Sequence, residues 1–192
     1  VGYGASFRVV DGALVMNILP VNYKSIEYIQ STGTQHINTE WMPTASAEIE
    51  TVIDLSETTN EYNSVFGCTC KTKGVFWLFA IKSTRKGTFY RAGTNKPLDK
   101  ELPFYRSQTA IRVEGQTLSV SSPFRSWSQT LTGTEIYDAK SYMTLFARND
   151  SATLESDTLL HVGALKMYSF RLYDKKTGSD QVALVRDFVP CI

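Results

Sequence analysis

Apolar and polar residues alternate with a period of two along much of the chain, which is the pattern of half-buried β-strands. In segment 47–55 (AEIETVIDL), one face carries Ala, Ile, Thr and Ile, and the other carries Glu48, Glu50 and Asp54. Segment 75–81 (VFWLFAI) is instead apolar on both faces, as a central strand of a two-sheet sandwich is. The two patterns together predict strands around a substantial core.

The later part of the chain continues the strand pattern. Residues 110–120 predict a hairpin that turns about Glu114-Gly115-Gln116, and further strands are predicted at 142–148, 164–174 and 181–190. Strands at intervals of ten to fifteen residues, with turn clusters between them, predict an all-β sandwich or barrel.

Helices have little place in this pattern, and the first 22 residues are less regular than the rest. No segment keeps a 3.6-residue apolar period over twelve residues, so only short helical turns near 124–128 or 151–156 fit. We interpret 1–22 as an N-terminal extension, either an added edge strand closed by Pro20 or the tail of a preceding domain. The sandwich is expected to occupy 23–192.

Composition agrees with one globular domain. The chain has 192 residues, 42% of them hydrophobic and 20% charged, with a formal net charge of +1. It holds no long run of like charge, so no nucleic-acid partner is expected. It holds no apolar run near 18 residues, so no direct membrane insertion is expected.

The chain opens without an initiator Met or a signal sequence, so we expect a fragment whose partners include further domains of the same protein. Three cysteines are too few for a disulfide scaffold, and the redox state of Cys68, Cys70 and Cys191 is open. Strand alternation puts Cys68 and Cys70 on one face. Without a third and fourth ligand nearby, they are expected to be half-buried thiols rather than a metal site.

Segment 26–41 (IEYIQSTGTQHINTEW) resembles the opening strand and turn, Y-I-x-S-T-G-T-Q-x-I-x-T, of concanavalin A-like, laminin G-like jelly-roll modules. Such modules occur in surface and secreted proteins of gut bacteria and in phage tail proteins. The resemblance covers about residues 24–191. Later segments resemble the strands of the family in the same order: 63–68 (NSVFGC), 143–150 (MTLFARND), 163–174 (GALKMYSFRLYD) and 183–191 (ALVRDFVPC).

The resemblance implies a jelly-roll β-sandwich of two antiparallel sheets, often with a concave face that binds glycans. It implies no single activity, because the superfamily holds lectins, carbohydrate-binding modules, adhesion domains and glycoside hydrolases. The sequence departs from the family at one point. Such modules commonly continue past the Arg-Asp-Phe-x-Pro segment with a short stretch of the YD type, whereas this chain ends two residues after it.

Catalytic machinery is not evident. The superfamily's hydrolase signatures, Glu-x-Asp-x-x-Glu and Glu-x-Asp-x-Glu, are absent. Glu48 and Glu50 share a face, but on a strand whose polar face we expect to meet water. His36 and His161 lack the spacing of a metal site, and no G-x-S-x-G elbow accompanies them. We therefore expect no enzymatic activity; a glycoside hydrolase would need two buried acidic groups facing each other in a cleft.

Glycan contacts need flat aromatic faces and planar polar side chains. Two stretches supply both, PFRSWSQT (123–130) and TFYRAGTNK (88–96), and a tryptophan ends the opening motif. The structural alternatives are an exposed strand and turn for 88–96 and packing under a loop for the tryptophan at 41. Trp77, inside 75–81, is expected in the core. The candidate ligand contacts are Trp127, Tyr90, Arg91, Asn95, Arg125 and Trp41.

Calcium is the one cofactor that the resemblance raises. Some laminin G-like modules bind calcium through loop Asp and Asn oxygens. On that resemblance Asn149, Asp150 and Asp157 are weak candidates, since they lack the dense D-x-D-x-D spacing.

The sequence therefore predicts a non-catalytic, lectin-like carbohydrate-binding module of a larger extracellular, cell-surface or phage tail protein, with a glycan or host-surface ligand. The alternative is a structural, adhesion or protein-interaction module without a glycan site. The two differ in whether Trp127, Tyr90 and Arg91 converge on one concave surface.

Overall fold

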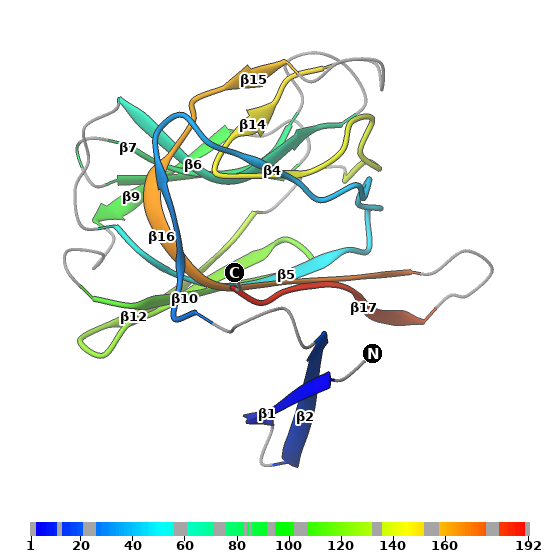
Figure 1. Cartoon of the computed structure of the whole chain (residues 1–192). Helices are drawn as coiled ribbons and strands as arrows, with labels where there is room; N and C mark the ends of the chain where they lie inside the picture. Colours follow the sequence, from blue (N-terminus) through cyan, green and yellow to red (C-terminus); the bar gives the residue numbers. More distant parts are fainter. Residues whose placement is uncertain are drawn as a thin grey trace.

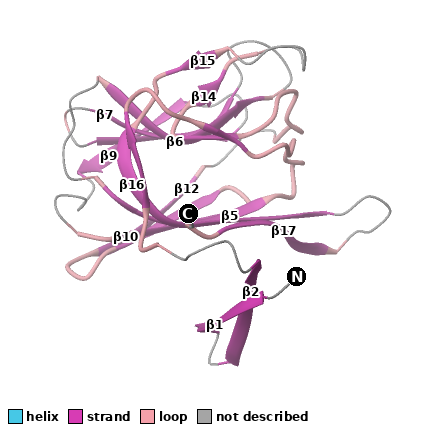
Figure 2. Cartoon of the chain, in the orientation of Figure 1, coloured by secondary structure: helices cyan, strands magenta, loops and turns pink. Residues whose placement is uncertain are grey.

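All regular structure in the described part of the chain is β-strand (Figure 2). Within the described residues, no helix is long and apolar enough to cross a membrane. The computed structural model describes residues 3–10, 13–20, 26–55, 61–70, 76–82, 84, 86–91, 95–101, 107–131, 136–151, 158–175 and 181–190.

Two antiparallel sheets lie face to face and form a sandwich (Figure 1). The seven-stranded sheet has the order β12 (Ser126–Thr130), β11 (Thr117–Ser121), β10 (Thr109–Glu114), β5 (Glu48–Asp54), β16 (Ala164–Lys175) and β17 (Val182–Phe188), with β3 (Ile29–Thr32) also on β16. The six-stranded sheet has the order β4 (Ile37–Asn38), β13 (Thr144–Leu145), β6 (Tyr62–Thr69), β7 (Phe76–Lys82), β8 (Lys86–Arg91) and β9 (Asn95–Glu101). The predicted all-β, jelly-roll sandwich is thereby confirmed.

The residue pattern explains the position of each strand. On β5, Ile49, Thr51 and Ile53 are buried while Glu48 and Glu50 are partly exposed, as the alternation predicts. On β7 both faces are buried for different reasons. The inward face enters the main core, and the outward residues Leu78 and Ala80 pack under Tyr90 of β8.

Aromatic rings fill the space between the sheets. Phe66 of β6 meets Phe170 of β16 across the sandwich, edge to face, with 6.1 Å between ring centroids. Trp77 and Phe79 pack against Phe66 on the same sheet, and Trp77 is core, as predicted. Phe188 of β17 extends the cluster to the edge of the seven-stranded sheet.

The predicted hairpin at 110–120 is confirmed as β10 and β11. Gly115 occupies its turn with φ of +53°, a left-handed conformation that glycine adopts without a steric penalty. The short helical turn considered near 124–128 is wrong, because Ser126–Thr130 is strand β12. Most of the second one, at 151–156, lies outside the described residues.

The strand predicted at 142–148 is also wrong in its middle. Phe146 has φ of +63°, which breaks the strand after β13, and its backbone N–H donates to Val65 O. The chain then joins a separate ladder, in which β14 (Arg148–Asn149) pairs with β15 (Leu159–Leu160). The alternation of apolar and polar residues does not reveal a positive φ in a bulky residue, so it could not predict this break.

The first residues form a hairpin of their own. Strands β1 (Tyr3–Val10) and β2 (Ala13–Pro20) pair with each other and, among the described strands, with no other. A strand added to the edge of the sandwich is therefore not observed. The boundary between this extension and the sandwich, at residues 22 and 23, stays a prediction.

Candidate functional site

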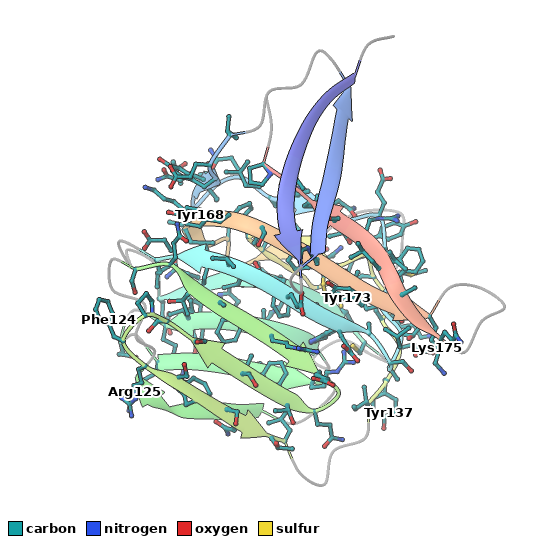
Figure 3. All side chains as sticks on the ribbon, turned by 90° about the horizontal axis from the view of Figure 1, so that it is seen from below. Phe124, Arg125, Tyr137, Tyr168, Tyr173 and Lys175 are labelled. Carbon is teal, nitrogen blue, oxygen red and sulfur yellow. The ribbon has the colours of Figure 1, made fainter. Side chains whose placement is uncertain are left out.

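The outward face of the seven-stranded sheet carries a hollow. Strand β5 presents Glu50 and Val52 there because the alternate residues Ile49, Thr51 and Ile53 point into the core. Strands β10, β11 and β16 present alternate residues to the same face, which Figure 3 views from below. Residues that lie opposite one another across the strands form rows on this surface.

One row consists of small side chains and forms the floor of the hollow. Ser169 of β16 pairs with Val52 of β5, which pairs in turn with Ala110 of β10. Ala110 pairs with Ser121 of β11. Because none of these side chains is large, the surface sinks along the row and leaves a cavity of about 420 Å³. Small-molecule sites commonly have volumes of roughly 300–1,000 Å³.

The next row carries charge. Arg171 pairs with Glu50, and Glu50 pairs with Arg112. The Glu50 carboxylate lies between the two guanidinium groups, 3.9 Å from Arg112 Nε and 3.8 Å from Arg171 Nη1. The Tyr173 hydroxyl donates a hydrogen bond to Glu50 Oε2 at 3.1 Å. We call Glu50, Arg112, Arg171 and Tyr173 the Glu50 cluster.

The Glu50 cluster is accessible and loosely held. The side chains of Arg112 and Glu50 are 54% and 37% exposed, whereas that of Arg171 is 19% exposed. Ion pairs at 3.8–3.9 Å are longer than hydrogen bonds and contribute little when exposed. A ligand can therefore replace part of each contact, accepting from the guanidinium N–H groups and donating to the carboxylate.

Negative charge gathers around this row. Burial raises the pKa of Glu48, the next outward residue of β5, and the neighbouring carboxylates of Glu114 and Glu50 raise it further. The pKa of Tyr173 is also raised, by burial first and then by the negative charge of Glu50. The phenol of Tyr173 therefore stays protonated and remains a donor to Glu50.

Aromatic side chains lie on this face of the seven-stranded sheet and at its edge. Tyr168 and Tyr173 lie on the same face at different points along β16 (Figure 3). Phe124, 82% exposed, and Arg125 occupy the turn between β11 and β12. The Ser122 hydroxyl accepts hydrogen bonds from the backbone N–H groups of both and thereby fixes this turn.

The ligand contacts predicted from the sequence do not meet on one surface. Trp127 sits opposite Val120 on the inward side of edge strand β12 and packs against the core. Its indole N–H has no hydrogen-bond partner among the described residues. Tyr90 lies on the other sheet, on its outward face with Leu78. Only Arg125, in the turn before β12, is near the face that carries the hollow (Figure 3).

Arg91 is buried in the core, with 1% of its surface exposed. Its guanidinium stacks on the Trp77 ring, 3.6 Å from the centroid, and Nη2 donates to the carbonyl oxygens of Ala45 and Ala47. Burial lowers the pKa of Arg91 to about 10. A ligand on the surface cannot reach this side chain. Asn95 begins β9, and its side chain lies outside the described residues.

Trp41 joins the opening motif to the closing strands. Its indole N–H donates to Asp174 Oδ2 at 2.9 Å, and the guanidinium of Arg186 stacks on its ring. Asp174 is fully buried and also accepts from the backbone N–H and the hydroxyl of Thr44 and from the backbone N–H of Lys175. We call Trp41, Thr44, Asp174 and Arg186 the Asp174 anchor. The alternative of packing under a loop describes Trp41 well.

The weak calcium candidates are engaged within the protein. The Asn149 amide donates to Tyr142 O, and its side-chain oxygen accepts from the Ser151 backbone N–H. The Asp150 carboxylate lies 3.8 Å from Arg148 Nη2, a cation that competes with any metal ion. Asp157 lies outside the described residues. Among those that are described, no three His, Cys, Asp or Glu side chains gather as metal ligands would.

The histidines and cysteines take structural positions. His36 is exposed, and His161 packs its ring on Tyr62 with 4.9 Å between centroids. Cys68 and Cys70 are free thiols on one inward face, as the alternation predicts, but they are buried completely rather than by half. Cys191 lies outside the described residues.

Comparisons with known proteins give fold likenesses only. No family model matches the sequence, and no curated protein does. Among solved structures, the K499G mutant of NanB sialidase from Streptococcus pneumoniae matches 84% of this chain with a TM-score of 0.52 and 13% identity. The full extracellular region of zebrafish Gpr126/Adgrg6 matches 87% with a TM-score of 0.50 and 12% identity.

In both matches the chain spans about a quarter of the other protein, 27% of the sialidase and 24% of the Gpr126/Adgrg6 extracellular region. At such low identity the likeness concerns the fold and assigns no residue. Together with the two stacked antiparallel sheets, it supports the resemblance to concanavalin A-like modules at the level of a jelly-roll β-sandwich.

Proposed function

We propose that the chain is a non-catalytic carbohydrate-binding module whose site is the hollow on the seven-stranded sheet. One observation carries the proposal: a row of small residues lies directly beside a row of accessible charged residues on the same face. The small row leaves room for a sugar ring over Val52 and Ala110. The charged row supplies hydrogen-bond donors and acceptors for the hydroxyl groups of that ring.

The surroundings of the hollow fit this function. Tyr168 and Tyr173 offer aromatic surface to the C–H faces of sugars. The serines of β11 and β16 add hydroxyl groups that donate and accept. A shallow site of this kind buries little area, so we expect weak binding of a single sugar and stronger binding when modules are repeated.

We place the module in a larger protein that acts outside the cell, as a surface, secreted or virion component. One solved structure with a similar fold is the extracellular region of Gpr126/Adgrg6, and another is a sialidase, an enzyme of sugar chemistry by its name. These likenesses favour an extracellular role and a glycan ligand without assigning either.

Hydrolysis is not part of the proposal. A retaining glycosidase needs two carboxylates about 5 Å apart at the scissile bond. Among the described residues that line the hollow, Glu50 is the one carboxylate, and two arginines and a tyrosine hold it. Glu50 is also 37% exposed, whereas a general acid of this kind sits in an apolar pocket.

A protein-interaction module is the second candidate, favoured by one specific feature. Phe124 is 82% exposed on a turn that Ser122 holds rigid, which suits an aromatic anchor in a partner's pocket. Phe124→Ala distinguishes the two functions. It should leave glycan binding within threefold of the parent if the hollow is the site.

The experiment is a glycan-array screen of the whole chain and of two tryptophan variants. Ala110→Trp fills the hollow from its floor, and Glu61→Trp places the same bulk at an exposed position beside β6 on the other sheet. We expect the parent and Glu61→Trp to bind the same glycans and Ala110→Trp to lose them. Equal binding by all three would place the site elsewhere. If the parent bound no glycan class, the protein-interaction function would be favoured instead.

A further inference from the structure

We propose that the hollow selects uncharged saccharides and disfavours acidic ones, an inference that rests on the proposed carbohydrate-binding function. Two arginines on the site would, taken alone, suggest an anionic ligand such as a sugar carboxylate. The contacts of those arginines point the other way.

Each arginine is already matched by carboxylates. Arg112 lies between Glu50 and Glu114, with its Nη2 atom 3.3 Å from Glu114 Oε2. Arg171 lies between Glu50 and Asp187, with its Nε atom 3.5 Å from Asp187 Oδ1. Three carboxylates therefore surround two guanidinium groups, and Glu50 is shared by both.

The remaining charges on or near this face are of both signs: Glu48 on β5, Lys175 at the end of β16 and Arg125 in the turn before β12. Glu48 is the next outward residue of β5 before Glu50, and its pKa is raised first by burial and then by Glu114 and Glu50, whereas Arg112 lowers it. Further along β16, Lys166 pairs in register with Asp54. A carboxylate or sulfate brought into the hollow would meet the three carboxylates that surround Arg112 and Arg171 and would have to displace Glu50 from both arginines.

A neutral sugar has no such cost. The guanidinium groups keep their carboxylate partners and use their remaining N–H groups as donors to hydroxyls. The outer lone pairs of Glu50 accept from other hydroxyls.

The test compares neutral saccharides with acidic counterparts: sialyl-lactose adds one acidic sugar to lactose, and galacturonate oligomers carry a carboxylate on each residue. The full chain is titrated with lactose and sialyl-lactose, and with galacto-oligosaccharides and galacturonate oligomers of equal length, at low salt and at physiological salt. We expect the neutral member of the bound pair to bind at least tenfold more tightly, and its affinity to change less than twofold with salt. The acidic member should gain as salt screens the repulsion.

Glu50→Gln sharpens the test, because it keeps the shape of the side chain and frees both arginines from the shared carboxylate. We expect the preference for the neutral ligand to fall at least fivefold in this variant. Glu61→Gln, an exposed position beside β6 on the other sheet, is the matched control and should keep the parent's preference. Asp187→Asn removes a different carboxylate partner of Arg171 and should shift the preference in the same direction as Glu50→Gln.

The outcomes separate the two claims. Equal or tighter binding of the acidic member by the parent chain would overturn this inference and leave the carbohydrate-binding function standing. An unchanged preference in both Glu50→Gln and Asp187→Asn would also overturn it. Absence of binding to every neutral and acidic probe would overturn the proposed function, and this inference with it.

Discussion

Two carboxylate clusters on the same sheet differ in how completely they are satisfied. In the Asp174 anchor, a fully buried carboxylate accepts four hydrogen bonds from Trp41, Thr44 and Lys175. In the Glu50 cluster, a carboxylate that is 37% exposed accepts one hydrogen bond and two longer ionic contacts. The first arrangement leaves nothing for a ligand, whereas the second can exchange its contacts. The buried cluster therefore holds the fold, and the open cluster is the one that we propose binds the ligand.

The largest difference should appear on removing each carboxylate. Asp174→Ala leaves the Trp41 indole N–H and two backbone N–H groups without acceptors in the interior. We expect it to lower the free energy of unfolding by about 3 kcal/mol or more. Glu50→Gln should lower it by less than about 1 kcal/mol, because its ion pairs are exposed. Urea denaturation followed by tryptophan fluorescence measures both, and similar losses would erase the distinction between the clusters.

The arginines of the two clusters should show opposite signatures. Arg112→Ala removes a donor from the hollow, and we expect glycan affinity to fall about tenfold, or ~1.4 kcal/mol, with stability unchanged. Arg186→Ala removes hydrogen bonds to Thr39 O and Glu40 O and the stacking on Trp41. It should cost about 1–2 kcal/mol of stability and leave affinity within twofold. Calorimetric titration measures the glycan affinity of both variants, and urea denaturation measures their stability. Loss of affinity in both variants would contradict the assignment of Arg112 to the site and Arg186 to the fold.

A smaller effect is expected from the tyrosine of the open cluster. Tyr173→Phe removes only the hydroxyl that donates to Glu50 and keeps the ring. Glu50 then loses an orienting contact, and we expect glycan affinity to fall about threefold, consistent with ~0.5–1 kcal/mol for one hydrogen bond. Tyr168→Phe is the matched control on the same strand. A larger loss in the control would show that Tyr168, not the Glu50 cluster, organises the ligand.

The smallest effect concerns pH. The folded-state pKa of Glu48 is raised, so its ionised form is disfavoured in the folded protein. Stability should therefore be reduced above the folded pKa and recover as the pH falls through it and the carboxyl takes up a proton. Because Glu48 is largely solvated, the effect at pH 7 should be only a few tenths of a kcal/mol after screening. Glu48→Gln should be slightly more stable than the parent at pH 7 and equal to it near pH 3. A loss of stability at pH 7 would reverse the sign and contradict the account.

The sequence predicted the sandwich well because its strands obey a local rule. The alternation of β5 and the hairpin around Gly115 depend on neighbouring residues and turn chemistry, and both are observed. The break at Phe146 was missed because a positive φ in a bulky residue is not a local preference; here it accompanies a tertiary hydrogen bond from the Phe146 backbone N–H to the Val65 carbonyl.

The candidate site was predicted poorly because it depends on register between distant strands. Glu50 and Arg171 are 121 positions apart and become neighbours only when β5 pairs with β16. Small residues such as Ala110 carry no signal of binding, although they create the hollow. The sequence instead favoured aromatic residues as ligand contacts, but two of them, Trp127 and Trp41, pack against the core. The alternation did place Glu50 on the outward face, which was the one usable signal.

The most direct test of the central claim is to map the bound glycan on the protein by NMR. The backbone amides of the uniformly labelled chain are followed while a neutral oligosaccharide chosen from the array is added. We expect the largest shifts on the hollow, at Val52, Ala110, Ser119 and Ser169, and none on the other sheet at Leu78 or Tyr90. Shifts confined to Leu78 and Tyr90, with the hollow unchanged, would contradict the account.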